Sequence, residues 1–201
     1  AQAREDMWIP LAPDADAVYD QVIVINLDEL VPLVACPHSP DNVKTVAEMN
    51  EIAVDQVLVG SCTNSSYRDL MIVAKMLKGR KIHPDVSFGV APGSKQVFEM
   101  IAKNGALADI IQSGARILES TCGFCVGCGQ APRSKSISLR TNNRNYEGRS
   151  GTKDALVHLV SAETAVASAL TGKFTDPSTL DFEKPVVELP EVYEIDDSLI
   201  V

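Results

Sequence analysis

The stretch QVLVGSCTNSSYRDLMIVAKML, residues 56–77, decides the fold class of this chain. It opens with the mostly apolar run of residues 56–59, which is typical of a strand buried on both faces. After a polar turn, apolar side chains recur at helical spacing, at Leu70, Val73, Ala74 and Leu77. This periodicity predicts a helix over residues 67–77 that stops near Gly79. A strand that leads through a turn into a helix is the repeating unit of α/β proteins.

The same alternation continues along the rest of the chain. Further strands are predicted over residues 21–26, 86–90, 116–118, 136–139 and 155–160. Helices are predicted to begin after Ser94 and Ser161, because serine commonly caps helix N-termini, and a short helix is predicted over residues 107–112. We therefore expect an α/β protein, a three-layer sandwich with a mostly parallel sheet and helices on both faces.

One domain is expected to account for the whole chain, which at 201 residues is long enough to bury a core without disulfides. Residues 1–50 are rich in Pro and Asp and are expected to form an irregular segment packed on the domain. Residues 51–172 are expected to form the α/β core. Residues 173–201 are rich in Pro and acids and are expected to be a linker or edge segment.

The net charge of −9 excludes several classes of function. An acidic chain lacks the broad positive surface that nucleic acids and anionic membranes attract, so we expect neither as a partner. No apolar run approaches the roughly 20 residues of a spanning helix. Residues 1–8 carry charges rather than the apolar stretch of a signal peptide, so a cytoplasmic location is expected.

The cysteines point to a metal or a cluster rather than to disulfides. There are five of them, Cys36, Cys62, Cys122, Cys125 and Cys128, and the last three form a C-x-x-C-x-x-C run. An odd, clustered set of thiols more often holds a metal than forms a disulfide framework. Four thiolates suit a zinc ion or a [4Fe–4S] cluster. A bacterial ferredoxin site is excluded, because Pro132 stands where the next cysteine would be. Zinc, a cluster and no metal all stay open on spacing alone.

Three chemical elements are predicted to meet at one edge of the sheet. Cys62, Cys122 and Asn143 each follow shortly after a predicted strand, and Arg144 comes next to Asn143. In open α/β sheets, ligands bind beyond the carboxyl ends of the strands. Residues far apart in the sequence are therefore expected to form one site.

Residues 133–149, here called the basic segment, are positively charged inside an acidic chain. They hold five cations against the single acid Glu147, namely Arg133, Lys135, Arg140, Arg144 and Arg149. The segment's net charge of +4 leaves −13 for the remainder. Arginine binds carboxylates through a planar fork of donors, so a small polyanionic ligand would suit this segment. The alternative is a solvated loop whose arginines pair with acidic neighbours.

Three motifs resemble those of the aconitase family. They are GSCTNS at residues 60–65, CGFCVG at residues 122–127 and NRNYEGR at residues 143–149, and they occur in the family's order. The resemblance runs from about residue 20 to residue 172. Three separate motifs in register are far more specific than any one of them.

The resemblance implies a particular site. Its metal ligands would be Cys62, Cys122 and Cys125, holding a [4Fe–4S] cluster whose fourth iron has no protein thiolate. That iron would bind a substrate hydroxyl and a carboxylate as a Lewis acid. Asn143 would hydrogen-bond at the cluster, and Arg144 and Arg149 would bind the carboxylates of a di- or tricarboxylate substrate.

The implied reaction is the isomerisation of citrate and isocitrate by dehydration and rehydration through cis-aconitate, as in the tricarboxylic acid cycle. The cysteine and asparagine motifs look closest to single-chain aconitases. Homoaconitase and the large subunit of isopropylmalate isomerase are alternatives within the family. A structural zinc module and an RNA-binding role are alternatives of other classes, and the acidic charge argues against RNA.

Some residues depart from the family pattern or have no counterpart in it. Cys128 stands where the family usually has Gln or Asn, and we expect it to be a bystander. Cys36 is expected to be a buried thiol without a role, and the histidines His38, His83 and His158 to be structural or surface residues. The family's acidic, histidine and serine catalytic groups come from other domains. We therefore expect further domains or a subunit as partners, and no turnover by this chain alone.

Overall fold

The computed structural model describes residue 7 and residues 9–181, 185–191 and 193. The chain divides into two units, residues 1–30 and 31–201. In the first unit the described residues include one short 3-10 helix, η2 (Leu27–Glu29), which Asn26 caps. The strand predicted over residues 21–26 is wrong: these residues are exposed and pair with no other strand. An extended run needs a hydrogen-bonding partner to become a strand.

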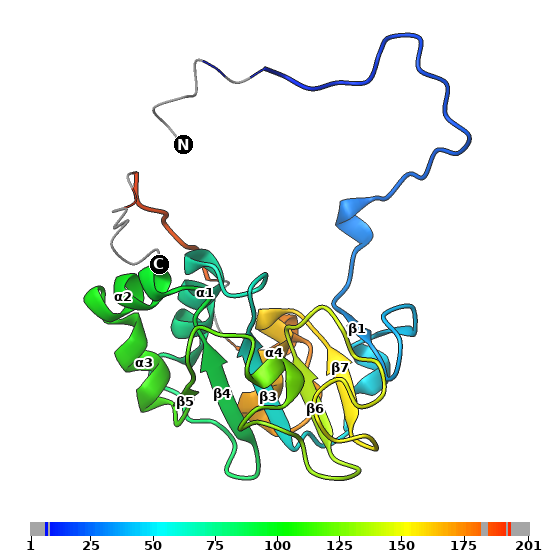
Figure 1. Ribbon diagram of the computed structural model, residues 1–201. Coiled ribbons are helices and arrows are strands. Elements are labelled where there is room, and N and C mark those ends of the chain that lie inside the picture. The colour runs from blue at the N-terminus through cyan, green and yellow to red at the C-terminus, as the bar shows by residue number, and fades with distance from the viewer. Residues whose placement is uncertain (1–6, 8, 182–184, 192, 194–201) are drawn as a thin grey trace. The chain divides into compact units, whose positions relative to one another are not determined.

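The second unit is built on a seven-stranded sheet with the order β2-β1-β7-β6-β3-β4-β5 (Figure 1). Five strands run parallel to one another, namely β3 (Gln56–Gly60), β4 (Ser87–Ala91), β5 (Arg116–Ile117), β6 (Ile137–Arg140) and β7 (Leu156–Leu159). All five lie within a residue or two of the predicted positions. A parallel sheet requires crossover connections, and predicted helices lie in two of them, from β3 to β4 and from β4 to β5.

The other two strands were not predicted. β1 (Leu33–Ala35) pairs antiparallel with β2 (Val43–Thr45) and with β7, so the sheet is mixed. Each is three residues long and the pair has a single fully buried apolar side chain, Val34, so no alternation marks them in the sequence. The 3-10 helix η3 (Ala47–Met49) follows β2.

Four α-helices have the predicted positions. They are α1 (Tyr67–Leu77), α2 (Lys95–Lys103), α3 (Ala106–Gln112) and α4 (Ala162–Thr171). Ser94 and Ser161 cap α2 and α4 as predicted, and Ser66 forms a capping box with Asp69 at the start of α1. A last short 3-10 helix, η5 (Pro177–Thr179), follows α4.

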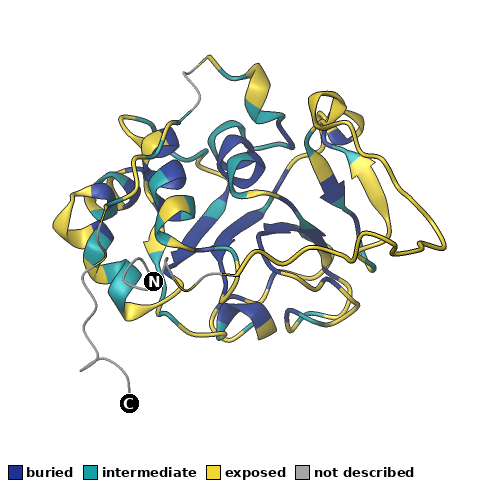
Figure 2. Cartoon of the chain, turned by 90° about the horizontal axis from the view of Figure 1, so that it is seen from above, coloured by how far each residue is buried: buried dark blue, intermediate teal, exposed yellow. Residues whose placement is uncertain are grey.

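The two faces of the sheet are covered by different kinds of structure. On one face Val57 and Val59 of β3 belong to a large core cluster that includes Leu70 of α1, Ile101 of α2, Ile110 of α3 and Val166 of α4. The strand side chains between them face the other way, where Leu58 and Ala91 pack against Phe124 and Cys125. Figure 2 shows the buried residues running through the central strands. Since successive side chains of a strand point to opposite faces, the two clusters are the two sides of one sheet.

The α/β class with a mostly parallel sheet is therefore confirmed. The four α-helices all contribute to the cluster on one face. The third layer, on the opposite face, is the segment after β5, which carries the 3-10 helix η4 (Phe124–Val126). Among the helices that the structure describes, none combines the length and the apolar character needed to cross a bilayer.

His158 of β7 is a structural residue, as expected. Its ring packs edge-on against Phe174 with centroids 5.1 Å apart, and the residue is 4% exposed. The pKa of His158 is lowered to about 4, mainly by burial and to a smaller extent by the charges of His38 and Lys44, although a hydrogen bond to the carbonyl of Leu156 acts in the opposite direction. The imidazole is therefore held neutral inside the fold.

This burial makes stability depend on pH. The unfolded chain binds a proton at His158 below its ordinary pKa of about 6.5, but the folded chain does so only below about 4. As the pH decreases through this window, we expect His158 to lower the free energy of unfolding by an amount on the order of 3 kcal/mol. In urea denaturation at several pH values, the free energy of unfolding of His158→Gln should decrease less steeply with decreasing pH than that of the wild-type chain. Equal slopes for both proteins would contradict the assignment.

Candidate functional site

The carboxyl ends of β3 and β6 are tied together by one hydroxyl. Thr141 follows β6, and its Oγ1 accepts from the Gly60 N–H and donates to the Gly60 carbonyl, both at 2.9 Å. Gly60 has φ 137°, and a Cβ at this position would lie 2.4 Å from the carbonyl oxygen of Ala91 in β4. The end of the central strand is thus fixed against both of its neighbours, and only glycine fits there.

The turn that carries Cys62 is strained and internally hydrogen-bonded. Ser61 has φ 142°, an uncommon value for a residue with a side chain. Its Oγ accepts from the N–H groups of Thr63 and Asn64, at 3.2 and 3.1 Å, and its carbonyl accepts from Ser65 Oγ at 2.6 Å. Such strain persists only where the surroundings hold it, and it often marks functional sites. Here it presents Cys62 as an exposed thiol.

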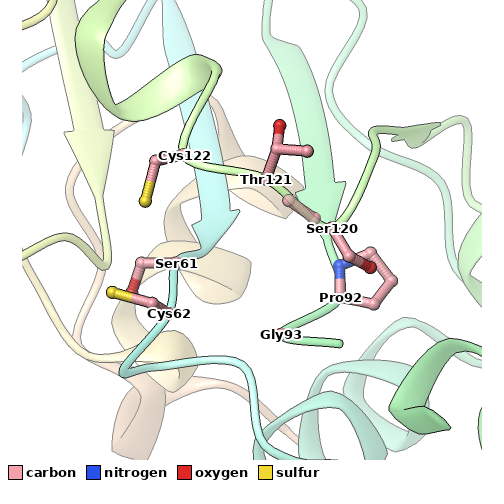
Figure 3. A pocket seen from close by; sticks show the side chains of 8 residues that line it. Ser61, Cys62, Pro92, Gly93, Ser120, Thr121 and Cys122 are labelled. Carbon is pink, nitrogen blue, oxygen red and sulfur yellow. The ribbon is translucent and has the colours of Figure 1, made fainter. Parts of the chain in front are cut away.

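Cys62 and Cys122 share a pocket of about 120 Å³. Its remaining walls are Ser61, Ala91, Pro92, Gly93, Ser120 and Thr121. Figure 3 shows the Cys122 thiol pointing toward the Ser61–Cys62 turn. The Ser120 hydroxyl is buried without a hydrogen-bond partner in the part of the chain that the structure describes. The structure therefore brings the first two predicted ligands to one place.

Residues 119–130, here called the cysteine loop, place the third thiol. Cys122 and Cys128 are exposed, whereas Cys125 lies in η4 and is 5% exposed. Burial raises the pKa of the Cys125 thiol, and the neighbouring Cys122 and Cys62 thiols raise it further, while Arg149 lowers it. Three cysteines that influence one another electrostatically lie in one region, although they come from two distant parts of the chain.

The arrangement of donors bears on the kind of metal group. Among the described residues, no three His, Cys, Asp or Glu side chains are placed to hold a metal ion. In a [4Fe–4S] cluster each thiolate binds its own iron, so the ligands surround a larger body. The exposed thiols of Cys62 and Cys122 at the pocket, with the buried thiol of Cys125 in the same loop as Cys122, suit a group of this size.

The amide of Asn143 lies beside the Cys62 turn. Its Nδ2 donates to Thr63 Oγ1 at 2.6 Å, and its Oδ1 accepts from Asn64 Nδ2 at 3.2 Å. Thr63 Oγ1 in turn lies 3.7 Å from the Cys62 sulfur. Sequence reasoning singled out Asn143 but not the roles of Thr63 and Asn64, although both are part of the GSCTNS motif. This network connects the loop after β6 to the first cysteine.

The basic segment does not form one surface. Arg133 pairs with Asp55 at 2.5 Å, and Arg140 is fully buried. The hypothesis of a single polyanion-binding island is therefore wrong for these two residues. Arg144 is exposed and donates to the carbonyl of Asn143 at 2.9 Å, and Arg149 is half-buried, with its guanidinium 6.0 Å from the centre of the Tyr146 ring.

The loop that presents Arg144 and Arg149 is anchored by a residue between them. Asn145 is 1% exposed, and its Nδ2 donates to the carbonyls of Ala35, Cys36 and Val157, at 2.8 to 3.3 Å. Two of the three acceptors are the last residue of β1, Ala35, and the residue that follows it, Cys36, so β1 helps to anchor this loop. Cys36 itself is a buried free thiol, as expected.

The three motifs that resemble those of the aconitase family thus lie on loops that follow β3, β5 and β6 of a mostly parallel sheet. The aconitase family model (aconitate hydratase) matches residues 1–172. The chain belongs to the aconitase family. The resemblance of its three motifs is thereby confirmed.

The curated relatives are more specific in name. The chain is 41% identical over 169 residues to the 3-isopropylmalate dehydratase large subunit 1 of Methanopyrus kandleri. It is 40% identical over 171 residues to the large subunit of the same name from Clostridium beijerinckii, and 41% over 174 residues to that of Clostridium botulinum. The matches cover 84% to 86% of this chain but only 40% to 42% of those relatives.

Two glycines of the cysteine loop provide a matched test of its packing. Gly127 has φ 91°, and a Cβ there would lie 2.3 Å from the Ser150 carbonyl oxygen. Gly129 has φ 66° with nothing within 4 Å. We expect Gly127→Ala to lower the free energy of unfolding by about 3 kcal/mol or more, from clash plus strain, and Gly129→Ala by about 1 kcal/mol, from strain alone. Urea denaturation followed by circular dichroism measures both, and equal losses would contradict the close approach.

Proposed function

We propose that this chain is the cluster domain of a hydro-lyase that moves a hydroxyl group between adjacent carbons of a hydroxy-dicarboxylate. The observation that carries the proposal is the meeting of Cys62, Cys122 and Cys125 beyond the carboxyl ends of β3 and β5. The proposed ligands are these three thiolates. The family match supports the same assignment.

The residues around the thiols suit that chemistry. When bound, a [4Fe–4S] cluster would supply an open iron as a Lewis acid for the substrate hydroxyl. Asn143, held by Thr63 and Asn64, keeps its amide next to the Cys62 turn, where second-sphere hydrogen bonds orient ligands. Arg144 and Arg149 would bind the carboxylates of the substrate through their forks of donors.

The substrate we propose is of the isopropylmalate kind rather than citrate. The relatives that cover most of this chain bear the name 3-isopropylmalate dehydratase. The preference for citrate and for the tricarboxylic acid cycle, drawn from the motifs, finds no support in those names. The alternative drawn from the same motifs, an isopropylmalate isomerase large subunit, fits them.

Activity is proposed to need more protein than this chain contains. The relatives are more than twice as long and are named as large subunits, so their enzymes have further parts. The described site offers proposed ligands, an amide and two guanidinium groups, but the residues that line the pocket include no His, Asp or Glu side chain. The remaining domains or subunits would supply it.

Cluster binding can be tested on the chain as it stands. After anaerobic reconstitution with iron and sulfide, we expect about three to four irons per chain and a broad visible absorption. Cys62→Ser, Cys122→Ser and Cys125→Ser should each abolish most of this absorption. Cys128→Ser is the matched control from the same loop and should retain it. One zinc per chain without iron uptake would sink the proposal.

The arginines can be tested in the enzyme assembled with its remaining parts. Arg144→Lys and Arg149→Lys keep the charge but lose the planar fork, so kcat/KM should fall at least about tenfold for each. Arg133→Lys makes the same change at a residue paired with Asp55 and should leave kcat/KM unchanged. Measuring formation of the unsaturated acid from isopropylmalate and from citrate also decides the substrate. A preference for citrate would overturn our choice.

A further inference from the structure

Arg140 is a fully buried cation between the sheet and the cysteine loop. It is the last residue of β6 and is 0% exposed. Its side chain lies on the sheet face opposite the helices, because Leu139 before it belongs to the helix-side cluster. The pattern of the sequence suggested a ligand-binding basic residue, whereas the structure assigns it an internal place.

All the hydrogen-bond partners of this guanidinium are neutral. Nη1 donates to the Phe124 carbonyl at 2.6 Å, and Nη2 donates to the Gln130 carbonyl at 2.8 Å and to Gln56 Oε1 at 3.0 Å. Nε donates to Ser138 Oγ at 3.0 Å. Among the described residues no carboxylate forms an ion pair with Arg140.

A buried charge without a counter-charge is costly, so this position calls for an explanation. Burial lowers the pKa of Arg140 to about 10, which leaves the guanidinium charged at neutral pH, and the interaction with Cys125 favours its charged form. Cys125 is also the buried member of the three proposed ligands. Because Arg140 donates to the carbonyl of Phe124, the residue before Cys125, the thiolate of that cysteine would be an anion close to Arg140 in the loaded protein.

The two carbonyl contacts have a second consequence. Phe124 immediately precedes Cys125, and Gln130 lies at the far end of the cysteine loop. One planar side chain thus holds the loop on both sides of Cys125 and docks it on β3 and β6 through Gln56 and Ser138. Lysine could supply the charge here but not the four directed contacts.

We propose that Arg140 positions the cysteine loop and serves as the internal counter-charge for an anionic cluster held by Cys62, Cys122 and Cys125. This inference rests on the proposed function. A fixed positive charge stabilises the reduced, more negative form of the cluster more than its oxidised form. Arg140 therefore raises the reduction potential of the bound cluster and slows its loss.

Three variants separate charge from packing. Arg140→Gln removes the charge and shortens the side chain, so the four hydrogen bonds are lost or weakened. Arg140→Lys keeps the charge but loses the planar fork of donors. Gln56→Glu is nearly isosteric and gives Arg140 a carboxylate partner in place of the amide oxygen. It should leave folding intact while cancelling the counter-charge. Arg133→Gln is the control, because Arg133 is exposed and already paired with Asp55.

The experiment reconstitutes each chain anaerobically and follows the reduced cluster by electron paramagnetic resonance during a redox titration. At a fixed potential we expect Arg140→Gln and Gln56→Glu to lower the reduced-to-oxidised ratio about tenfold, equivalent to about 59 mV for one electron. Arg140→Lys and Arg133→Gln should keep the wild-type ratio within about twofold. Iron loss to a chelator should be faster for Arg140→Lys and Arg140→Gln but not for Arg133→Gln.

Unchanged ratios in Gln56→Glu and Arg140→Gln would overturn the counter-charge, as would a tenfold fall in Arg140→Lys. If Arg140→Gln does not fold, Gln56→Glu and Arg140→Lys decide the question. If the wild-type chain takes up no iron, the proposed function fails, and the counter-charge fails with it. Positioning is then judged by hydrogen exchange of residues 122–130 in the metal-free chain. Faster exchange in Arg140→Lys supports it, and unchanged exchange overturns it.

Discussion

The central strand β3 is buried on both faces, and each face is covered by a different part of the chain. Val57 and Val59 belong to the core cluster on the helix side, where α4 contacts β3, whereas Phe124 and Cys125 of the cysteine loop pack with Leu58. The side chains of such a strand are shielded from water only if the helices on one face and the cysteine loop on the other are both in place. The cysteine loop is therefore part of the core as well as part of the candidate site, and the stability of the domain depends on its place.

This double use couples packing to chemistry. Phe124 and Cys125 fill the second cluster, and Gly127 lies so close to Ser150 that no side chain fits. A shift of the loop that moved Cys125 would open the core, so the third thiol is held more firmly than the exposed Cys62 and Cys122. At Cys62, which is exposed, hydrogen bonds between Ser61 and the following residues Thr63, Asn64 and Ser65 hold the turn instead.

The sequence predicted the regular part of the fold well, because apolar periodicity and serine caps are local signals. It predicted helix α1 at its observed bounds and the caps of α2 and α4. It failed where pairing decides. Residues 21–26 have a strand-like composition but no pairing partner. β1 and β2 show no clear strand pattern in the sequence, yet β1 pairs with both β2 and β7. Pairing between distant segments leaves no local mark.

The candidate site divides in the same way. The position of Cys62, Cys122 and Asn143 just beyond the strands was determined by the sequence itself, because parallel strands end at one edge whatever packs on them. Only the tertiary structure decided what each cation does. Arg140 and Arg144 are four residues apart in one basic segment, yet one is fully buried and the other exposed. Arg140 is the last residue of β6, and the cysteine loop covers the face of the sheet on which its side chain lies. Because that loop comes from another part of the chain, the sequence around Arg140 does not predict its burial.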